Sequence, residues 1–101
     1  MINVLIADDH SMVREGLKQL LELDGDIKVL GEAGNGETCL RLIDSLQPDV
    51  VLLDIQMPGM SCEDAVRKLK KDFPKLKILI LSSINEDEII YRLIKICHTH
   101  R

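Results

Sequence analysis

The stretch "DVVLLDIQMPGM" (residues 49–60) places four consecutive apolar residues between two aspartates and then runs into a turn. A short and nearly continuous apolar run of this kind predicts a strand that is buried on both faces of a parallel sheet. The strand ends at Asp54, where a charge is costly unless the carboxylate is paired or used. The pattern therefore predicts a central strand and marks Asp54 as a candidate functional residue.

Similar apolar runs recur along the chain and alternate with segments of helical periodicity. Further strands are predicted over residues 2–7, 27–33 and 77–82. A helix is expected after each of the four strands: from a cap at Ser11 to a turn at 24–26, from 35–37 to Pro48, over about 62–71, and over 85–97. This alternation predicts a single α/β domain with a doubly wound parallel sheet and helices on both faces.

Composition and charge exclude several classes of protein. The chain has 101 residues, of which 46% are hydrophobic, so it is long enough for one compact domain with a modest core. Its net charge is −4, and basic groups such as "RKLKK" (67–71) form no stripe with aromatic residues between them. Direct nucleic-acid binding is therefore not expected. Without a leader pattern or a membrane-length apolar stretch, a cytoplasmic location and no membrane partner are expected.

The cysteines and the last residues give little sign of a second kind of site. Cys39, Cys62 and Cys97 are an odd number at wide spacings, which favours buried or free thiols over a disulfide framework. The tail "CHTH" (97–100) offers a thiol and two imidazoles, but a zinc site needs about four ligands in a fixed tetrahedron. A divergent terminus explains these residues more simply.

Polar side chains follow three of the predicted strands. Asp8 and Asp9 end the first strand, Asp54 ends the third and Ser82 ends the fourth, and ligands of such sheets collect at the carboxyl ends of the strands. Three converging carboxylates repel one another unless a cation is present, and Mg²⁺ prefers such oxygen ligands. A single aspartate at a strand end is usually a polar terminus, whereas this combination favours a magnesium site. His10 is expected to be a loop residue and not a base.

Three motifs, in this order and spacing, resemble the receiver domain of two-component response regulators. They are "LIADDH" (5–10), "VVLLDIQMPGM" (50–60) and "ILILSS" (78–83), and the likeness covers residues 1–95. Within that family, "ADDHSMVREGL" (7–17) resembles the branch whose receivers precede a LuxR-type helix-turn-helix DNA-binding domain. The resemblance implies a flavodoxin-like fold, with five parallel strands in the order 2-1-3-4-5.

The resemblance also implies a role for each matching residue. Asp54 matches the phosphoacceptor, which takes a phosphoryl group from a sensor histidine kinase. Asp8, Asp9 and Asp54 match the carboxylates that hold Mg²⁺, together with the backbone carbonyl of Gln56. Ser82 matches the switch hydroxyl that hydrogen-bonds the new phosphate; its alternative role as a helix cap falls more naturally to a neighbouring residue.

The sequence departs from the family after Lys95, where it reads "ICHTHR" (96–101) in place of a fifth strand, the family's lysine and a fifth helix. The expected organisation is therefore an incomplete receiver over residues 1–95, with strand order 2-1-3-4, and a divergent tail over 96–101. Without the lysine, phosphorylation should be slower. Residues 77–82 would form an open edge, so the chain either self-associates through its fourth strand or fourth helix or is part of a longer receiver.

Two kinds of function stay open after this comparison. In the favoured hypothesis the domain is a phosphorylation switch that modifies itself and turns over no external substrate. In the alternative, a degenerate or truncated receiver acts only through protein contacts, without phosphorylation. A phosphatase with an aspartate nucleophile fits poorly because Asp8 and Asp9 are adjacent, and "GEAGNGE" (31–37) lacks the glycine spacing and the lysine of a phosphate-binding loop.

Overall fold

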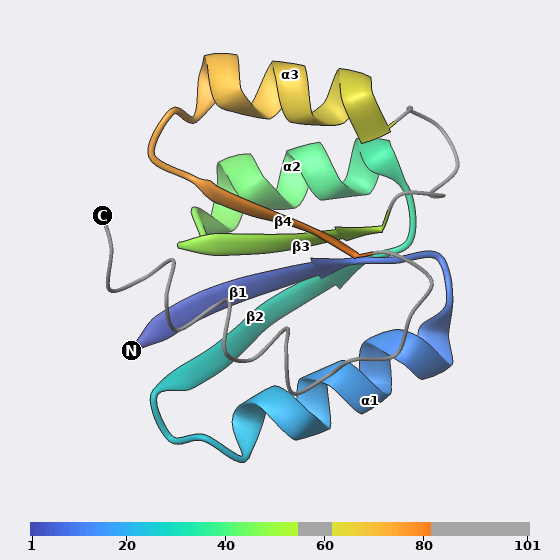
Figure 1. Cartoon of the computed structure of the whole chain (residues 1–101), viewed down its shortest axis with the longest axis vertical. Helices are drawn as coiled ribbons and strands as arrows, with labels where there is room; N and C mark the ends of the chain where they lie inside the picture. The colour runs from blue at the N-terminus through green and yellow to red at the C-terminus, as the bar shows by residue number, and fades with distance from the viewer. Residues whose placement is uncertain (55–61, 82–101) are drawn as a thin grey trace.

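The computed structural model describes residues 1–54 and 62–81, where strands and helices alternate along the chain (Figure 1). The strands are β1 (Ile2–Ala7), β2 (Ile27–Ala33), β3 (Val50–Asp54) and β4 (Lys77–Leu81). The helices are α1 (Ser11–Glu22), α2 (Gly36–Leu46) and α3 (Cys62–Asp72). All strand pairs are parallel, in the order β2-β1-β3-β4, which confirms the predicted α/β sheet and its order. The helix predicted over 85–97 lies outside the described residues.

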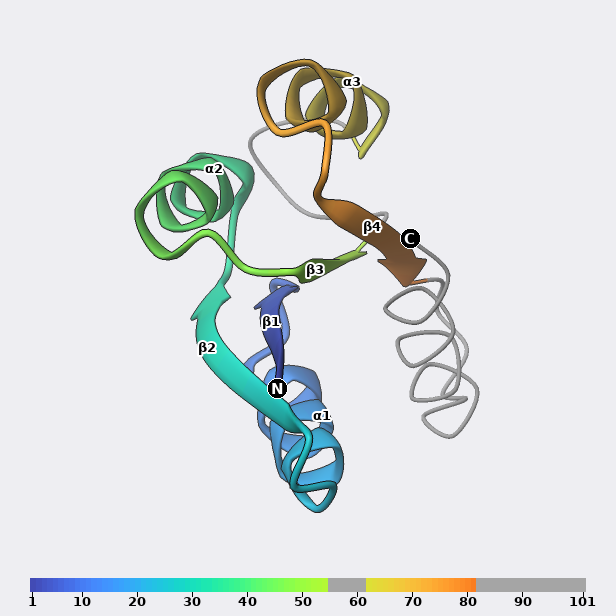
Figure 2. The same cartoon turned by 90° about the vertical axis from the view of Figure 1, so that its left-hand side faces the viewer.

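The sheet separates two apolar layers, with α1 on one face and α2 and α3 on the other (Figures 1 and 2). Alternate residues of each strand point to opposite faces, so neighbouring positions enter different layers. The layer on the α1 side contains Ile2, Val4, Ile6, Leu17, Leu21, Ile27, Val29, Val50 and Leu52. The layer on the side of α2 and α3 contains Leu5, Ala7, Ala33, Cys39, Ile43, Val51, Leu53, Ala65 and Leu69.

The central and outer strands differ in burial. Residues 50–53 of β3 are fully buried, as the apolar run predicted for a strand covered on both faces. Within residues 1–54 and 62–81, β4 pairs with β3 alone, and Ile80 keeps 45% of its surface exposed. In this part of the chain β4 is therefore the edge that the sequence predicted.

The helix ends follow local chemistry, with one exception. The Asn35 side chain accepts a hydrogen bond from the Thr38 N–H at 2.8 Å and caps α2, and Gln47, with φ of 49°, ends the helix before Pro48. The prediction that Ser11 caps the first helix is wrong. The cap position belongs to His10, whose side chain makes no capping bond, because the Asp8 carboxylate accepts the His10 N–H and turns the chain one residue earlier.

Asp49 ties three strands together at their amino ends. Its carboxylate accepts a hydrogen bond from the Asn3 N–H at 2.8 Å, and its own N–H donates to the Asn3 carbonyl at 2.8 Å. Its carbonyl accepts from the Lys77 N–H at 3.1 Å. These bonds satisfy main-chain groups at the starts of β1 and β4, and they fix the register of these strands against β3.

Cys39 is the thiol that the described residues place inside the protein. It is buried and free, and burial raises the pKa of its thiol to about 11. At neutral pH it is therefore a protonated apolar side chain of the layer under α2, which confirms the predicted buried thiol at this position. The side chain of Cys62 and all of Cys97 lie outside the description.

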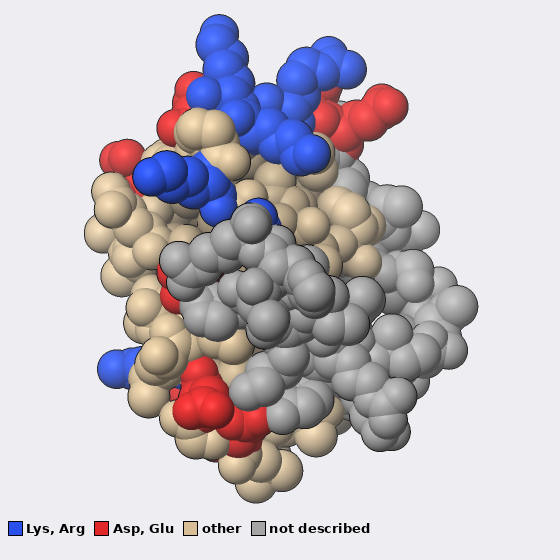
Figure 3. All heavy atoms as spheres, turned by 60° about the vertical axis from the view of Figure 1, so that its left-hand side comes forward, with Lys and Arg blue, Asp and Glu red and all other residues tan. Residues whose placement is uncertain are grey.

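The molecular surface carries its basic residues unevenly. Figure 3 shows lysine and arginine side chains gathered over α3, whose exposed basic residues are Arg67, Lys68, Lys70 and Lys71. Two of these lie in the last turn of the helix, where they complement the helix dipole. No helix within the described ranges combines the length and the apolar character that crossing a membrane requires.

Candidate functional site

The register of the two central strands brings two aspartates together. Ile6 pairs with Leu52 and Ala7 pairs with Leu53, so Asp8 and Asp54 are the next residues along neighbouring parallel strands. Ile6 and Leu52 both face α1, and the positions two residues later lie on the same side of the sheet. The carboxyl ends of β1 and β3 therefore hold their aspartates side by side.

Asp8, Asp9, His10 and Asp54 form one cluster at this end of the sheet. One side-chain ligand atom from each residue lies within 4.8 Å of the others. Asp8 is the buried member, at 5% exposure, whereas Asp54 is partly buried and Asp9 lies toward solvent. The predicted convergence of Asp8, Asp9 and Asp54 is confirmed as geometry. The cluster combines one buried carboxylate with two that are more exposed.

His10 lies in the loop before α1, as predicted, and also belongs to this cluster. Its Nδ1 lies 2.8 Å from Asp9 Oδ1 and 3.1 Å from Asp8 Oδ1, and its main-chain N–H donates to Asp8 Oδ1 at 2.8 Å. The ring itself is largely exposed. The sequence signal for this contact was the position of His10 directly after two aspartates, since residues that follow the end of a strand lie at the same edge of the sheet.

The carboxylates raise the pKa of the His10 imidazole above its ordinary value of 6.5. The hydrogen bond to Asp8 is the largest cause, followed by the charges of Asp9, Asp8 and Asp54. A raised folded-state pKa means that the protonated ring favours the folded state. This contribution is present below pH 6.5 and is lost as the pH rises through the folded-state value.

We expect an NMR titration of the metal-free protein to give His10 an imidazole pKa above 6.5. Asp8→Asn should bring the pKa back toward 6.5, because it removes the charged acceptor of the strongest contact. Asp9→Asn should lower it less. A wild-type value at or below 6.5 would show that the contacts to the carboxylates are absent in solution.

Arg14 and Glu32 lie beside the cluster on the α1 side. Neither was predicted from the sequence as a site residue. Arg14 Nη1 donates to the main-chain carbonyl of Asp8, and Arg14 Nε donates to Glu32 Oε1 at 3.2 Å. Glu32 is next to last in β2 and pairs with Ile6. The predicted strand order did not identify them, because their contact also depends on the register of β2 against β1, which shifts between Val4 and Leu5.

The donors of this cluster suit a hard divalent cation. Three carboxylates supply oxygen ligands, which Mg²⁺ prefers. The carboxylates hold the His10 imidazole through the same oxygens, so a bound cation and the imidazole would share Asp8 and Asp9. The chemistry of the donors therefore fits the expected magnesium ion at Asp8, Asp9 and Asp54.

Two predicted site residues are not described by the structure. Gln56, expected to lend a backbone carbonyl to the metal, and Ser82, expected to be the switch hydroxyl, both lie outside residues 1–54 and 62–81. Asp54 pairs with Leu81 across β3 and β4, so Ser82 is the next residue after the strand that adjoins Asp54.

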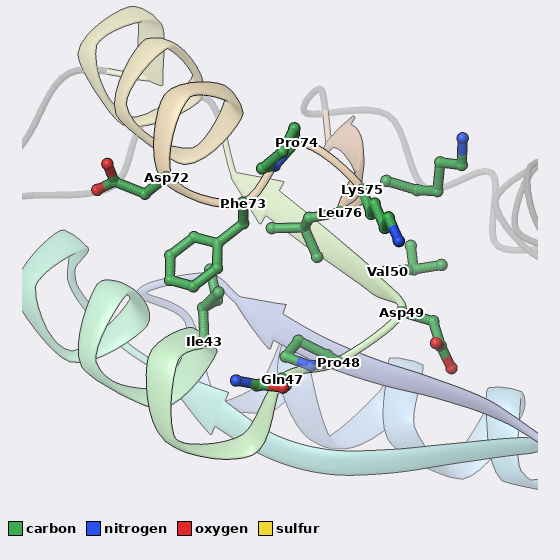
Figure 4. A pocket seen from close by; sticks show the side chains of 11 residues that line it. Ile43, Gln47, Pro48, Asp49, Val50, Asp72, Phe73, Pro74, Lys75 and Leu76 are labelled. Carbon is green, nitrogen blue, oxygen red and sulfur yellow. The ribbon is translucent and has the colours of Figure 1, made fainter.

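A cleft of about 790 Å³ lies at the opposite end of the strands, between the segments that enter β3 and β4. Figure 4 shows Phe73 beside Ile43, with Asp72 pointing away from both. The Asp49 carboxylate on its rim already accepts the Asn3 N–H. The cleft lies at the amino ends of the strands, where ligands of parallel sheets rarely bind, so the acidic cluster is the better candidate site.

Sequences similar to this chain include response regulators and a transcriptional regulatory protein. Residues 4–97 match the family model described as the response regulator receiver domain. The transcriptional regulatory protein YdfI of Bacillus subtilis is 46% identical over 92 residues, which are 89% of this chain and 42% of that protein. The response regulator GacA of Pseudomonas aeruginosa is 41% identical over 95 residues, 94% of this chain and 44% of that protein. The chain thus spans less than half the length of these relatives.

Solved structures of response regulator receiver domains have the same fold as this chain. The signal receiver domain of NarL from Mycobacterium tuberculosis superposes with a TM-score of 0.77 at 35% identity, covering 93% of this chain and 76% of that one. The isolated receiver domain of RcsB from Salmonella enterica, solved with the phosphomimetic BeF₃⁻, gives 0.78 at 29% identity, covering 93% and 70%. These likenesses confirm the flavodoxin-like fold class.

Proposed function

Because this chain belongs to the response regulator receiver domain family, we propose that it is the phosphoacceptor switch of a two-component signalling system. The observation that carries the proposal is the convergence of Asp8, Asp9 and Asp54 within 4.8 Å at the carboxyl ends of the two central strands. In the proposed reaction Asp54 is the phosphoacceptor, and a sensor histidine kinase or a small phosphodonor supplies the phosphoryl group.

The proposed step is a phosphoryl transfer to a carboxylate. An Asp54 oxygen attacks phosphorus, and the bond from phosphorus to the donor's leaving atom breaks with its electron pair staying on that atom. The product is an acyl phosphate on Asp54. β3 contributes positioning, because its buried residues 50–53 fix the backbone from which Asp54 projects.

Asp8, Asp9 and Asp54 would hold Mg²⁺, with Gln56 adding a backbone carbonyl. Bound Mg²⁺ would offset the negative charge of the incoming phosphoryl oxygens. Asp8 is held by its neighbours on the main chain and at the carboxylate, whereas the more exposed Asp9 is the more adaptable ligand. Ser82 would then hydrogen-bond the new phosphate and report it to the rest of the domain.

The proposed role is that of a switch that modifies itself and turns over no external substrate. We propose that the domain serves a longer transcription regulator, since YdfI is a transcriptional regulatory protein more than twice the length of the match, and that it works in the cytoplasm. In this proposal the receiver domain spans residues 1–95 and a divergent tail spans residues 96–101. We expect no direct contact of this chain with nucleic acid or membrane.

Phosphorylation tests the proposal directly. The whole chain is incubated with Mg²⁺ and acetyl phosphate, and its intact mass is measured beside a sample in which EDTA has removed the metal. We expect a gain of one phosphoryl group per chain only when Mg²⁺ is present, because the carboxylates repel the phosphodonor without it. No gain in either sample would favour the alternative, a degenerate receiver that works through protein contacts alone.

Self-association through the fourth strand or fourth helix is a second proposal. Ile80 on β4 keeps 45% of its surface exposed, and one similar structure contains two RcsB dimers bound to parallel DNAs. We expect light scattering to give a mass above that of one chain at high concentration, and Ile80→Glu to lower it. A single-chain mass at every concentration would contradict this proposal.

A further inference from the structure

One guanidinium joins three segments at the carboxyl ends of β1 and β2. Arg14 Nη1 donates to the main-chain carbonyl of Asp8, and Arg14 Nε donates to Glu32 Oε1 at 3.2 Å. The Arg14 side chain is only 20% exposed, although it lies in the first turns of a surface helix. It therefore links the start of α1, the end of β1 and the end of β2.

The fold dictates this meeting point. Glu32 pairs in register with Ile6, which faces α1, so the Glu32 side chain emerges on the side of the sheet that carries Arg14. Gly34 follows at close range, since a Cβ built on it would lie 3.4 Å from Arg14 Nη1. A Cβ at position 34 would thus come into van der Waals contact with the guanidinium.

The bonds of Arg14 complete the fixation of Asp8. The Asp8 N–H donates to the Ala33 carbonyl at 2.9 Å, and the Asp8 carbonyl accepts from Arg14, so both main-chain groups of this residue are held. The Asp8 carboxylate in turn accepts the His10 N–H at 2.8 Å. Asp8 is therefore held at both main-chain groups and at its carboxylate, at the start of the turn that carries Asp9.

We propose that Arg14, braced by Glu32, is a positioning residue that holds the Asp8–His10 turn in the geometry in which its carboxylates bind the divalent cation. The cation part of this inference rests on the proposed function. A charged donor makes a stronger hydrogen bond than a neutral one, and the planar guanidinium holds its donors in a fixed fork, whereas those of a lysine ammonium rotate on a flexible stem. Groups that orient metal ligands from behind typically change metal affinity about 10–100-fold when removed.

The test compares Arg14→Ala and Arg14→Lys with wild type and with Arg41→Ala, an exposed arginine of α2 that serves as the matched control. Two quantities are measured by NMR: the hydrogen-exchange rate of the His10 N–H without metal, and the Kd for Mg²⁺ alone from amide shifts. We expect Arg14→Ala to speed the exchange and to raise the Kd for Mg²⁺ about tenfold. Arg14→Lys should restore part of both, and Arg41→Ala should change neither.

The outcomes separate this inference from the proposed function. If Arg14→Ala lowers Tm but leaves the His10 exchange rate and the Mg²⁺ Kd at wild-type values, Arg14 is merely structural and the inference fails. If exchange accelerates while wild type binds no Mg²⁺, the turn is positioned as inferred and the proposed function fails instead. If Arg14→Ala does not fold, Arg14→Lys and Glu32→Ala decide, and wild-type values in both overturn the inference.

Discussion

Replacement of Asp54 by asparagine is expected to reduce phosphorylation by acetyl phosphate from one phosphoryl group per chain to none. Asparagine keeps the volume of the side chain but removes the anionic oxygen that attacks phosphorus. Asp54 is also one of the three carboxylates of the proposed cation site, and the substitution removes its negative charge from that site. Intact-mass spectrometry with Mg²⁺ present measures the loss directly.

Asp44→Asn is the matched control, because Asp44 is an exposed aspartate on α2, outside the acidic cluster. It should take up phosphate as wild type does, and the phosphate on both proteins should be labile to hydroxylamine, as an acyl phosphate is. A full phosphoryl gain on Asp54→Asn would place the acceptor elsewhere, with Asp8 and Asp9 as the next candidates.

Replacement of Leu52 by alanine is expected to lower the free energy of unfolding by about 3 kcal/mol, the middle of the range for a leucine removed from a tight core. Leu52 is fully buried at the centre of β3, in the apolar layer that α1 covers. Rigid strands on both sides restrict collapse of the cavity. The loss is a large share of the roughly 5–15 kcal/mol that stabilises a typical domain.

Urea unfolding followed by circular dichroism measures this change. Leu53→Ala probes the opposite layer and should cost a similar amount, because Leu53 is equally buried under α2 and α3. Leu23→Ala is the control: this side chain is 83% exposed, and its loss should change stability by less than about 0.5 kcal/mol. A cost for Leu52→Ala no larger than that of the control would mean that the two-layer core is wrong.

Most of the fold was predictable because hydrophobic period is a local property. Each predicted strand agrees with the structure to within one residue at either end, and β3 shows why: a short apolar run rich in valine and bounded by aspartates favours a strand covered on both faces. Helix starts were less predictable. Asn35 caps α2 through its own side chain, whereas the start of α1 depends on the Asp8 carboxylate two residues before His10.

The candidate site divides in the same way. Asp8, Asp9 and Asp54 could be identified because strand ends are visible in the sequence and parallel strands end at one edge. His10 lies in the loop before α1, as predicted, but its contacts with both carboxylates were not predicted, since only the folded turn brings the ring to them. Arg14 and Glu32 are 18 residues apart, and their contact depends on the shifted register of β2 against β1, which the predicted strand order does not specify.

The sequence by itself determined the alternation of strands and helices, the buried central strand and the three aspartates at the carboxyl edge of the sheet. Those features follow from the period of apolar residues and from chain order, which act over a few residues. The tertiary structure alone decided that Asp49 pins β1 to β3 and β4, that His10 contacts both Asp8 and Asp9, and that Arg14 braces the site. Such contacts depend on register and side-chain direction across different elements, which no local pattern specifies.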